Sequence, residues 1–207
     1  MATELARKLG FIHLDTGAMY RAVALAALRS GVISDPHAVA ELSRSAQIEL
    51  DFAVEPAAVL LDGRDITADI RLPEVTNVTY CAADNPEVRA ELVRQQRLIA
   101  SRIESLVTEG RDQGTVVFPN AEFKFFIDAR PQERARRRVH QLALKGIDAA
   151  YETILQELLI RDERDRSRSV GPLKPADDAV TIDSTEMNLS EVVTLLAQLV
   201  AAGRIDT

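Results

Sequence analysis

Short apolar runs alternate with segments of helical length along most of the sequence, and this alternation restricts the fold more than any other feature. The runs FIHLD, TVVF, FKFFIDA and AVTIDS predict strands, because apolar, β-branched and aromatic residues in unbroken series are typical of strands buried on both faces. Chains that alternate strands with helices form parallel sheets covered by helices. The sequence therefore predicts an α/β fold with a parallel sheet flanked by helices.

Helices are expected where apolar residues recur at helical spacing and a stop signal follows, such as Gly10, Gly31 or Gly110. The predicted helices cover residues 2–9, 18–30, 35–45, 86–109, 131–145, 151–166 and 190–202. The runs IELDF and VLLDGRDI, with a turn at Asp62-Gly63, predict a small antiparallel hairpin. We expect one domain, 1–207, with an insert at about 47–80.

Charge and cysteine content exclude several classes of protein. A net charge of -7 argues against broad binding to nucleic acid or to an anionic membrane, because both need a basic surface. One cysteine and a charged N-terminal segment argue against a disulfide framework and a secretion signal, and indicate a cytoplasmic protein. The basic residues are 21 Arg and 4 Lys, which indicates either a focused anion pocket or GC-rich coding.

The motif LDTGAMYR joins a predicted strand to a predicted helix. Thr16 and Gly17 lie at the helix N-terminus, where free amides and the helix dipole favour an anion, and Arg21 follows about one turn later. Open α/β sheets bind ligands at such strand ends. In the alternative interpretation, Asp15 or Thr16 is an ordinary N-cap and Arg21 is a surface residue.

Two further motifs concentrate charge. GRDQGTVVFP places Arg111 and Asp112 in the turn before the predicted strand TVVF, either as a functional pair or as an ordinary loop ion pair. RDERDRSR, at 161–168, is either a solvated helix face with i to i+4 pairs or a set of arginines around a transferring phosphoryl group. Spacing alone does not separate these alternatives.

Four segments, in this order, resemble the bacterial cytidylate kinases: LDTGAMYRAVALAAL, LLDGRDITADIR with PEVRAELVRQQR, GRDQGTVVFPNAEFKFFIDA, and RDERDRSRSVGPLKPADDAVTIDST. The resemblance covers essentially the whole chain. It implies the P-loop nucleoside monophosphate kinase fold and transfer of the γ-phosphoryl group of ATP, accompanied by Mg²⁺, to CMP or dCMP. Residues of about 47–80 would then form the monophosphate-binding insert and about 145–172 the lid. A UMP or AMP kinase is the alternative within the class.

The resemblance also implies roles for individual residues. The substrate-binding residues would be Thr16, Arg21, Arg89, Arg111, Asp112 and Asp165, and the catalytic residues Arg161, Arg164 and Arg168. Arg21 and Arg111 would hold the CMP phosphate, and Arg89 with Asp112 would read the cytosine edge. Asp165 would contact the sugar. The family has a serine near the base just before PEVR, where this chain has Thr79 or Tyr80.

The resemblance has a gap at the start of the chain. None of the nine glycines is followed by lysine, so the phosphate loop G-x-x-x-x-G-K-[ST] does not occur in the sequence. The family pattern places Met1 directly after that loop, and places the strand before the loop in the middle of the sheet, between TVVF and FKFFIDA. We therefore expect the 207 residues to be unstable and inactive by themselves.

Two explanations of this gap are open: a start further upstream, or a noncatalytic relic that keeps a CMP-like pocket. For the protein as a whole we expect a monomer without a metal ligand set, a nucleic-acid partner or a membrane partner.

Overall fold

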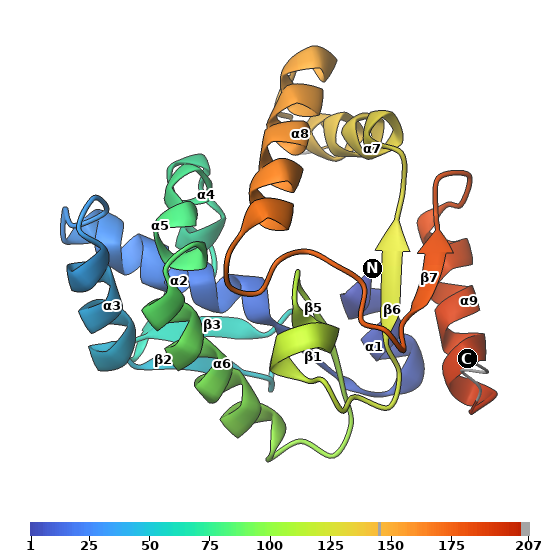
Figure 1. The fold of residues 1–207 in the computed structure, drawn as a ribbon, viewed down its shortest axis with the longest axis horizontal. Coiled ribbons are helices and arrows are strands. Elements are labelled where there is room, and N and C mark those ends of the chain that lie inside the picture. Colours follow the sequence, from blue (N-terminus) through green and yellow to red (C-terminus); the bar gives the residue numbers. More distant parts are fainter. Residues whose placement is uncertain (145, 204–207) are drawn as a thin grey trace. The chain divides into compact units, whose positions relative to one another are not determined.

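The computed structural model describes residues 1–144 and 146–203 (Figure 1). The chain divides into two compact units, Ala2–Gly110 and a second that begins at Arg111. None of the described helices is long and apolar enough to cross a membrane.

The first unit contains a parallel strand pair, a small antiparallel sheet and several helices. Its elements are α1 (Ala2–Leu9), β1 (Ile12–Asp15), α2 (Thr16–Arg29), α3 (Pro36–Ser45), β2 (Ile48–Asp51), β3 (Ala58–Leu61), β4 (Arg64–Asp65), the 3₁₀ helix η1 (Asp69–Arg71), α4 (Pro73–Val78), α5 (Tyr80–Ala83), α6 (Pro86–Ala100) and β5 (Leu106–Glu109). Helix α2 contributes residues to both buried apolar clusters of this unit. It is therefore the central helix of the unit.

Local sequence chemistry explains where the helices of this unit begin and end. The side chain of Asp35 accepts hydrogen bonds from the amides of His37 and Ala38, and the side chain of Asn85 caps α6 in the same way. A proline follows each of these caps, at the first helical position, where no amide is needed. Gly10 ends α1 at φ 71°, a conformation that glycine adopts readily. The predicted bounds of α1 and α3 are confirmed.

The antiparallel sheet has the order β2-β3-β4, and a turn at Asp62-Gly63 connects β3 to β4. Both turn residues have positive φ, 50° and 76°, as a two-residue hairpin turn requires. The predicted hairpin is confirmed, and the sheet that contains it has three strands.

Two predictions about the middle of the chain are wrong. The helix predicted over 86–109 ends at Ala100, and Leu106–Glu109 forms the strand β5, which pairs in parallel with β1. The first three residues of the predicted strand TVVF lie in η2 (Gln113–Val117), a π-helix, and Phe118 is its C-cap. Arg111 and Asp112 therefore follow a strand instead of preceding one, because the strand pairing with β1 is β5.

The described residues of the second unit form a parallel strand pair and three α-helices. Its elements are η2, β6 (Phe125–Asp128), α7 (Pro131–Ala143), α8 (Tyr151–Ser167), β7 (Val180–Asp183) and α9 (Leu189–Ala201). Strands β6 and β7 pair in parallel, with Phe125 opposite Val180 (Figure 1). With β1 and β5, this pair confirms the α/β class with parallel strands. Lys145, the predicted end of one helix and start of the lid, and residues 204–207 lie outside the described residues.

Candidate functional site

The carboxyl ends of β1 and β5 lie next to each other and carry the first candidate residues. Asp15 is paired with Glu109 in the strand register, and the buried Thr16 donates a hydrogen bond from Oγ1 to the carbonyl oxygen of Glu109 at 2.8 Å. Asp15 Oδ1 accepts from the amide of Ala18 at 3.0 Å, so Asp15 is the N-cap of α2. Register and capping together fix the position of the N-terminus of α2 beside the end of β5, from which the chain continues into Arg111.

Arg21 extends from α2 towards the segment that connects the small sheet to α5. Its Nη1 donates to the carbonyl oxygen of Ile70 at 3.2 Å and to Thr76 Oγ1 at 2.7 Å. The sequence contains no signal that would single out Thr76. Arg21 is thus held in a defined orientation by groups some 50 residues away in the sequence.

Arg89 is only 4% exposed, which is unusual for an arginine. Its Nη1 donates to the carbonyl oxygen of Ala83 at 3.1 Å, and its Cζ lies 5.5 Å from the ring centroid of Tyr20. This distance permits a cation–π interaction, which the low exposure strengthens. Tyr20, the residue before Arg21, therefore connects the second candidate arginine to α2.

Two residues, Thr79 and Tyr80, are candidates for the position at which the family has a serine near the base. Thr79 is half-buried and donates from Oγ1 to the carbonyl oxygen of Val75 at 2.7 Å. Tyr80 is the first residue of α5 and is 47% exposed.

Three arginines surround one buried carboxylate in the second unit. Asp165, in the last turns of α8, is 5% exposed. Its Oδ2 accepts from Arg111 Nε at 2.7 Å, its Oδ1 accepts from Arg168 Nη2 at 2.7 Å, and Arg161 Nε lies 3.8 Å from Oδ2. Three guanidinium groups converge on this one carboxylate, and guanidinium groups held in place suit the binding of a phosphate. We call Asp165, Arg111, Arg161 and Arg168 the Asp165 cluster.

The charge alternation of 161–168 thus has two functions in the structure. Asp165 belongs to the cluster, whereas Asp162, also 5% exposed in its side chain, pairs with Arg134 of α7 through two bonds of 3.1 and 2.6 Å. Asp162 therefore holds α7 and α8 together. Arg164 lies in the last turn of α8 and is exposed.

Asp112 is 4% exposed and its backbone begins η2, because its carbonyl oxygen accepts from the amides of Val116 and Val117 at 2.9 and 3.2 Å. The stem of Lys124 packs on this turn: a Cβ added to Gly114 would lie 3.3 Å from Lys124 Cδ. The Lys124 ammonium group, which is buried, donates to the carbonyl oxygen of Pro119 and to Asp178 Oδ2 at 2.5 Å. Lys124 therefore supports the turn that follows Arg111 and Asp112.

Sequence reasoning missed Lys124, although a lysine within the apolar run FKFFIDA is a detectable signal. Its partner Asp178 leads to a prediction about the pH dependence of stability. Hydrogen bonding to Lys124 lowers the pKa of Asp178 below its ordinary value. A carboxyl group whose pKa is lowered by folding stabilises the folded state above its unfolded pKa, about 4, and this contribution is lost as the pH falls.

We therefore expect Asp178→Asn to lower the free energy of unfolding at pH 7, and the difference from the parent to shrink as the pH falls below about 4. Urea unfolding at pH 7 and at acid pH measures the difference. Asp177→Asn, at the neighbouring exposed position, is the matched control. A difference that stays constant with pH would contradict the ionic role of Asp178.

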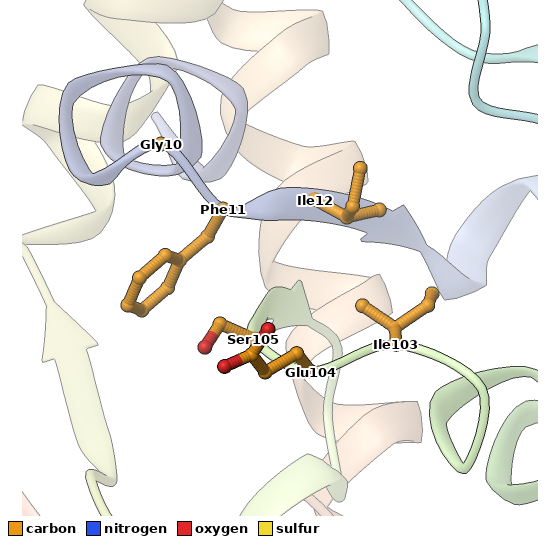
Figure 2. A pocket seen from close by; sticks show the side chains of 6 residues that line it. All are labelled: Gly10, Phe11, Ile12, Ile103, Glu104 and Ser105. Carbon is orange, nitrogen blue, oxygen red and sulfur yellow. The ribbon is translucent and has the colours of Figure 1, made fainter.

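A shallow hollow of about 330 Å³ lies at the opposite, amino-terminal ends of β1 and β5 (Figure 2). It is lined by Gly10, Phe11, Ile12, Ile103, Glu104 and Ser105. Glu104 is the ionisable residue among these six, and a carboxylate repels phosphate. None of the six lining residues is a candidate site residue, so the hollow is not the candidate phosphate site.

The chain is also similar to known proteins of one family. Residues 1–202 match the family model described as cytidylate kinase. Curated relatives named cytidylate kinase include those of Vibrio cholerae (46% identity, 91% of this chain and 84% of the relative), Aeromonas hydrophila (47%, 93% and 84%) and Pelotomaculum thermopropionicum (44%, 99% and 91%).

Proposed function

Because this chain belongs to the cytidylate kinase family, we propose that it transfers the γ-phosphoryl group of ATP to CMP or dCMP, giving CDP or dCDP and ADP. The observation that supports this most directly is the Asp165 cluster, in which Arg111 and Arg168 each lie 2.7 Å from one buried carboxylate. Phosphoryl transfer depends mainly on positioning and on neutralising the charge of the phosphate oxygens, and fixed guanidinium groups do both. A noncatalytic relic is not favoured, since the family match extends over residues 1–202.

The proposed roles follow from the surroundings of each residue. Arg21 and Arg111 bind the acceptor phosphate, because each guanidinium group is oriented by hydrogen bonds to groups distant in sequence. Arg161 and Arg168 complete the phosphate site, and the carboxylate of Asp165 orients these arginines and contacts the sugar. Buried hydrogen-bonding groups that a wrong substrate leaves unpaired discriminate strongly.

That reasoning supports a base-reading role for Arg89 and Asp112, each 4% exposed, with Thr79 or Tyr80 in the place of the family's serine. Thr16 lines the acceptor pocket through its position at the N-terminus of α2. Arg164 belongs to the lid, on the basis of its exposed position at the end of α8.

The ATP side of the reaction needs a phosphate loop, and the 207 residues contain no G-x-x-x-x-G-K-[ST]. In the described part of the chain, β5 pairs with β1 and β6 pairs with β7, so each of these four strands has one edge without a strand neighbour. An open strand edge has backbone N–H and C=O groups that can pair with another strand. We therefore propose that a strand followed by a phosphate loop, additional to these residues, completes the donor site.

Magnesium is proposed to accompany the phosphates of ATP, where it would neutralise charge on the transferring group. Within residues 1–144 and 146–203, no group of three or more His, Cys, Asp or Glu side chains could hold a metal ion.

An enzyme-linked assay of nucleoside diphosphate formation tests the function. We expect a chain extended by a strand and phosphate loop to phosphorylate CMP and dCMP in preference to UMP and AMP. The 207 residues by themselves should give no CDP. Equal turnover by both chains would contradict the donor proposal, and a preference for UMP or AMP would contradict the proposed acceptor.

The single kinase domain with its insert and lid, the monomeric state, the cytoplasmic location and the absence of a nucleic-acid partner stay predictions.

A further inference from the structure

We propose that Thr76 is a positioning residue that orients Arg21 for the acceptor phosphate. This inference rests on the proposed function, in which Arg21 binds that phosphate. Thr76 belongs to the short helix α4 and lies 55 residues from Arg21 in the sequence. Its side chain is exposed, so that packing of an apolar core does not explain its hydroxyl group.

The geometry at Arg21 determines the direction of its guanidinium plane. Nη1 carries two hydrogens, and the structure gives it two acceptors: the carbonyl oxygen of Ile70 at 3.2 Å and Thr76 Oγ1 at 2.7 Å. Two bonds from one nitrogen fix both the position and the rotation of the planar group. The direction of the rest of the guanidinium group, whose planar fork suits a phosphate, is thereby set.

Thr76 is itself oriented for this task. Its Oγ1 donates to the carbonyl oxygen of Leu72 at 3.2 Å, which uses its one hydrogen and leaves oxygen lone pairs to accept from Arg21. The two acceptors of Arg21 Nη1 named above thus lie in one short segment, 70–76, which we call the anchoring segment.

The anchoring segment is fastened to the helix that carries Arg21. The side chains of Ile70 and Val75 are fully buried in the apolar cluster that includes Ala22 and Leu25 of α2. Two ion pairs flank this contact: Arg29 to Asp69 at 2.5 Å and Arg71 to Asp15 at 3.2 Å. The two acceptors therefore keep their positions relative to α2.

Removal of the Thr76 hydroxyl group should leave Arg21 with more conformations before the substrate binds. Ordering one side chain of this kind on binding reduces affinity by about 2- to 12-fold. The loss should apply to ligands that carry a phosphate, because Arg21 contacts that group in the proposed function. Cytidine, which lacks the phosphate, should be unaffected.

The test is calorimetric titration of CMP and of cytidine into the parent protein, here the chain extended by the proposed strand and phosphate loop, and into its Thr76→Val variant. This change keeps the shape of the side chain and removes the hydroxyl group. We expect the dissociation constant for CMP to rise about five-fold and that for cytidine to stay within about two-fold. Thr76→Ser should restore CMP affinity. In an Arg21→Ala background, Thr76→Val should have no additional effect.

The matched control is Thr181→Val, the same change at an exposed threonine of β7. It should leave both dissociation constants unchanged, and circular dichroism verifies that each variant is folded. If Thr76→Val leaves CMP binding unchanged, weakens cytidine binding equally, or adds to Arg21→Ala, the positioning role is wrong. If the parent binds CMP no more tightly than cytidine, the phosphate site itself is wrong, and the proposed function fails with it.

Discussion

Replacement of Arg111 with alanine is expected to weaken CMP binding by about 10- to 100-fold, because a hydrogen bond to a charged group contributes about 1.5–3 kcal/mol. The Nε of Arg111 donates to Asp165 at 2.7 Å, and 40% of the Arg111 side chain is exposed. The guanidinium group is therefore both oriented and accessible to a ligand. The KM for ATP should change much less than the KM for CMP.

Stability should be little affected by this substitution. Asp165 keeps its bond to Arg168 at 2.7 Å, so the buried carboxylate remains paired when Arg111 is removed. Titration calorimetry with CMP, steady-state kinetics of the active enzyme and thermal unfolding measure the three quantities. Arg111→Lys keeps the charge without the planar fork and should lie between the parent and the alanine variant.

Arg138→Ala removes an exposed arginine of α7 and is the matched control for this experiment. An equal rise of the KM for CMP and the KM for ATP in Arg111→Ala would show that Arg111 does not act on the acceptor phosphate.

Asp162→Ala should instead lower the free energy of unfolding by about 3 kcal/mol, the lower end of the range for breaking a buried ion pair. The Asp162 carboxylate is 5% exposed and binds both Nη atoms of Arg134, at 3.1 and 2.6 Å. The Arg134 side chain is 27% exposed, so water can partly replace the lost partner. Chemical denaturation measures the change.

The affinity of the folded Asp162→Ala protein for CMP should stay near that of the parent. The paired substitution of Arg134→Met with Asp162→Leu is the control, since replacing both partners of a buried ion pair by apolar residues is often neutral. If Asp162→Ala weakened CMP binding and left stability unchanged, Asp162 would belong to the substrate site. Asp165 lies one turn later on the same side of α8, but it pairs with Arg111 and Arg168 instead of Arg134.

Local chemistry made much of the fold predictable. Asp35-Pro36 and Asn85-Pro86 begin helices because the first residue caps free amides and the second lacks an amide that would need a partner. Asp62-Gly63 forms a hairpin turn because both positions require positive φ. These signals act within a few residues, and the sequence contains them entirely.

The segment between Ala100 and Phe118 could not be predicted in the same way. Leu98, Ile99 and Ile103 continue the helical spacing of α6, but Leu106–Glu109 pairs with β1, which lies more than 90 residues earlier. The β-branched residues Thr115–Val117 adopt a π-helix, in which the carbonyl oxygen of Asp112 accepts from the amides of Val116 and Val117 and Lys124 packs against Gly114. Tertiary contacts overrode local preference in both places.

The sequence by itself determined the α/β class, the helix caps, the hairpin turn and the residues that are candidates for phosphate binding. Only the tertiary structure decided which side chains pair. Asp162 forms an ion pair with Arg134, and Asp165 forms ion pairs with Arg111 and Arg168. Thr76 accepts a hydrogen bond from Arg21. The physical reason is the separation along the chain over which each interaction acts. Caps and turns depend on neighbours along the chain, whereas ion pairs and buried hydrogen bonds depend on distances in space, which the packing of strands and helices sets.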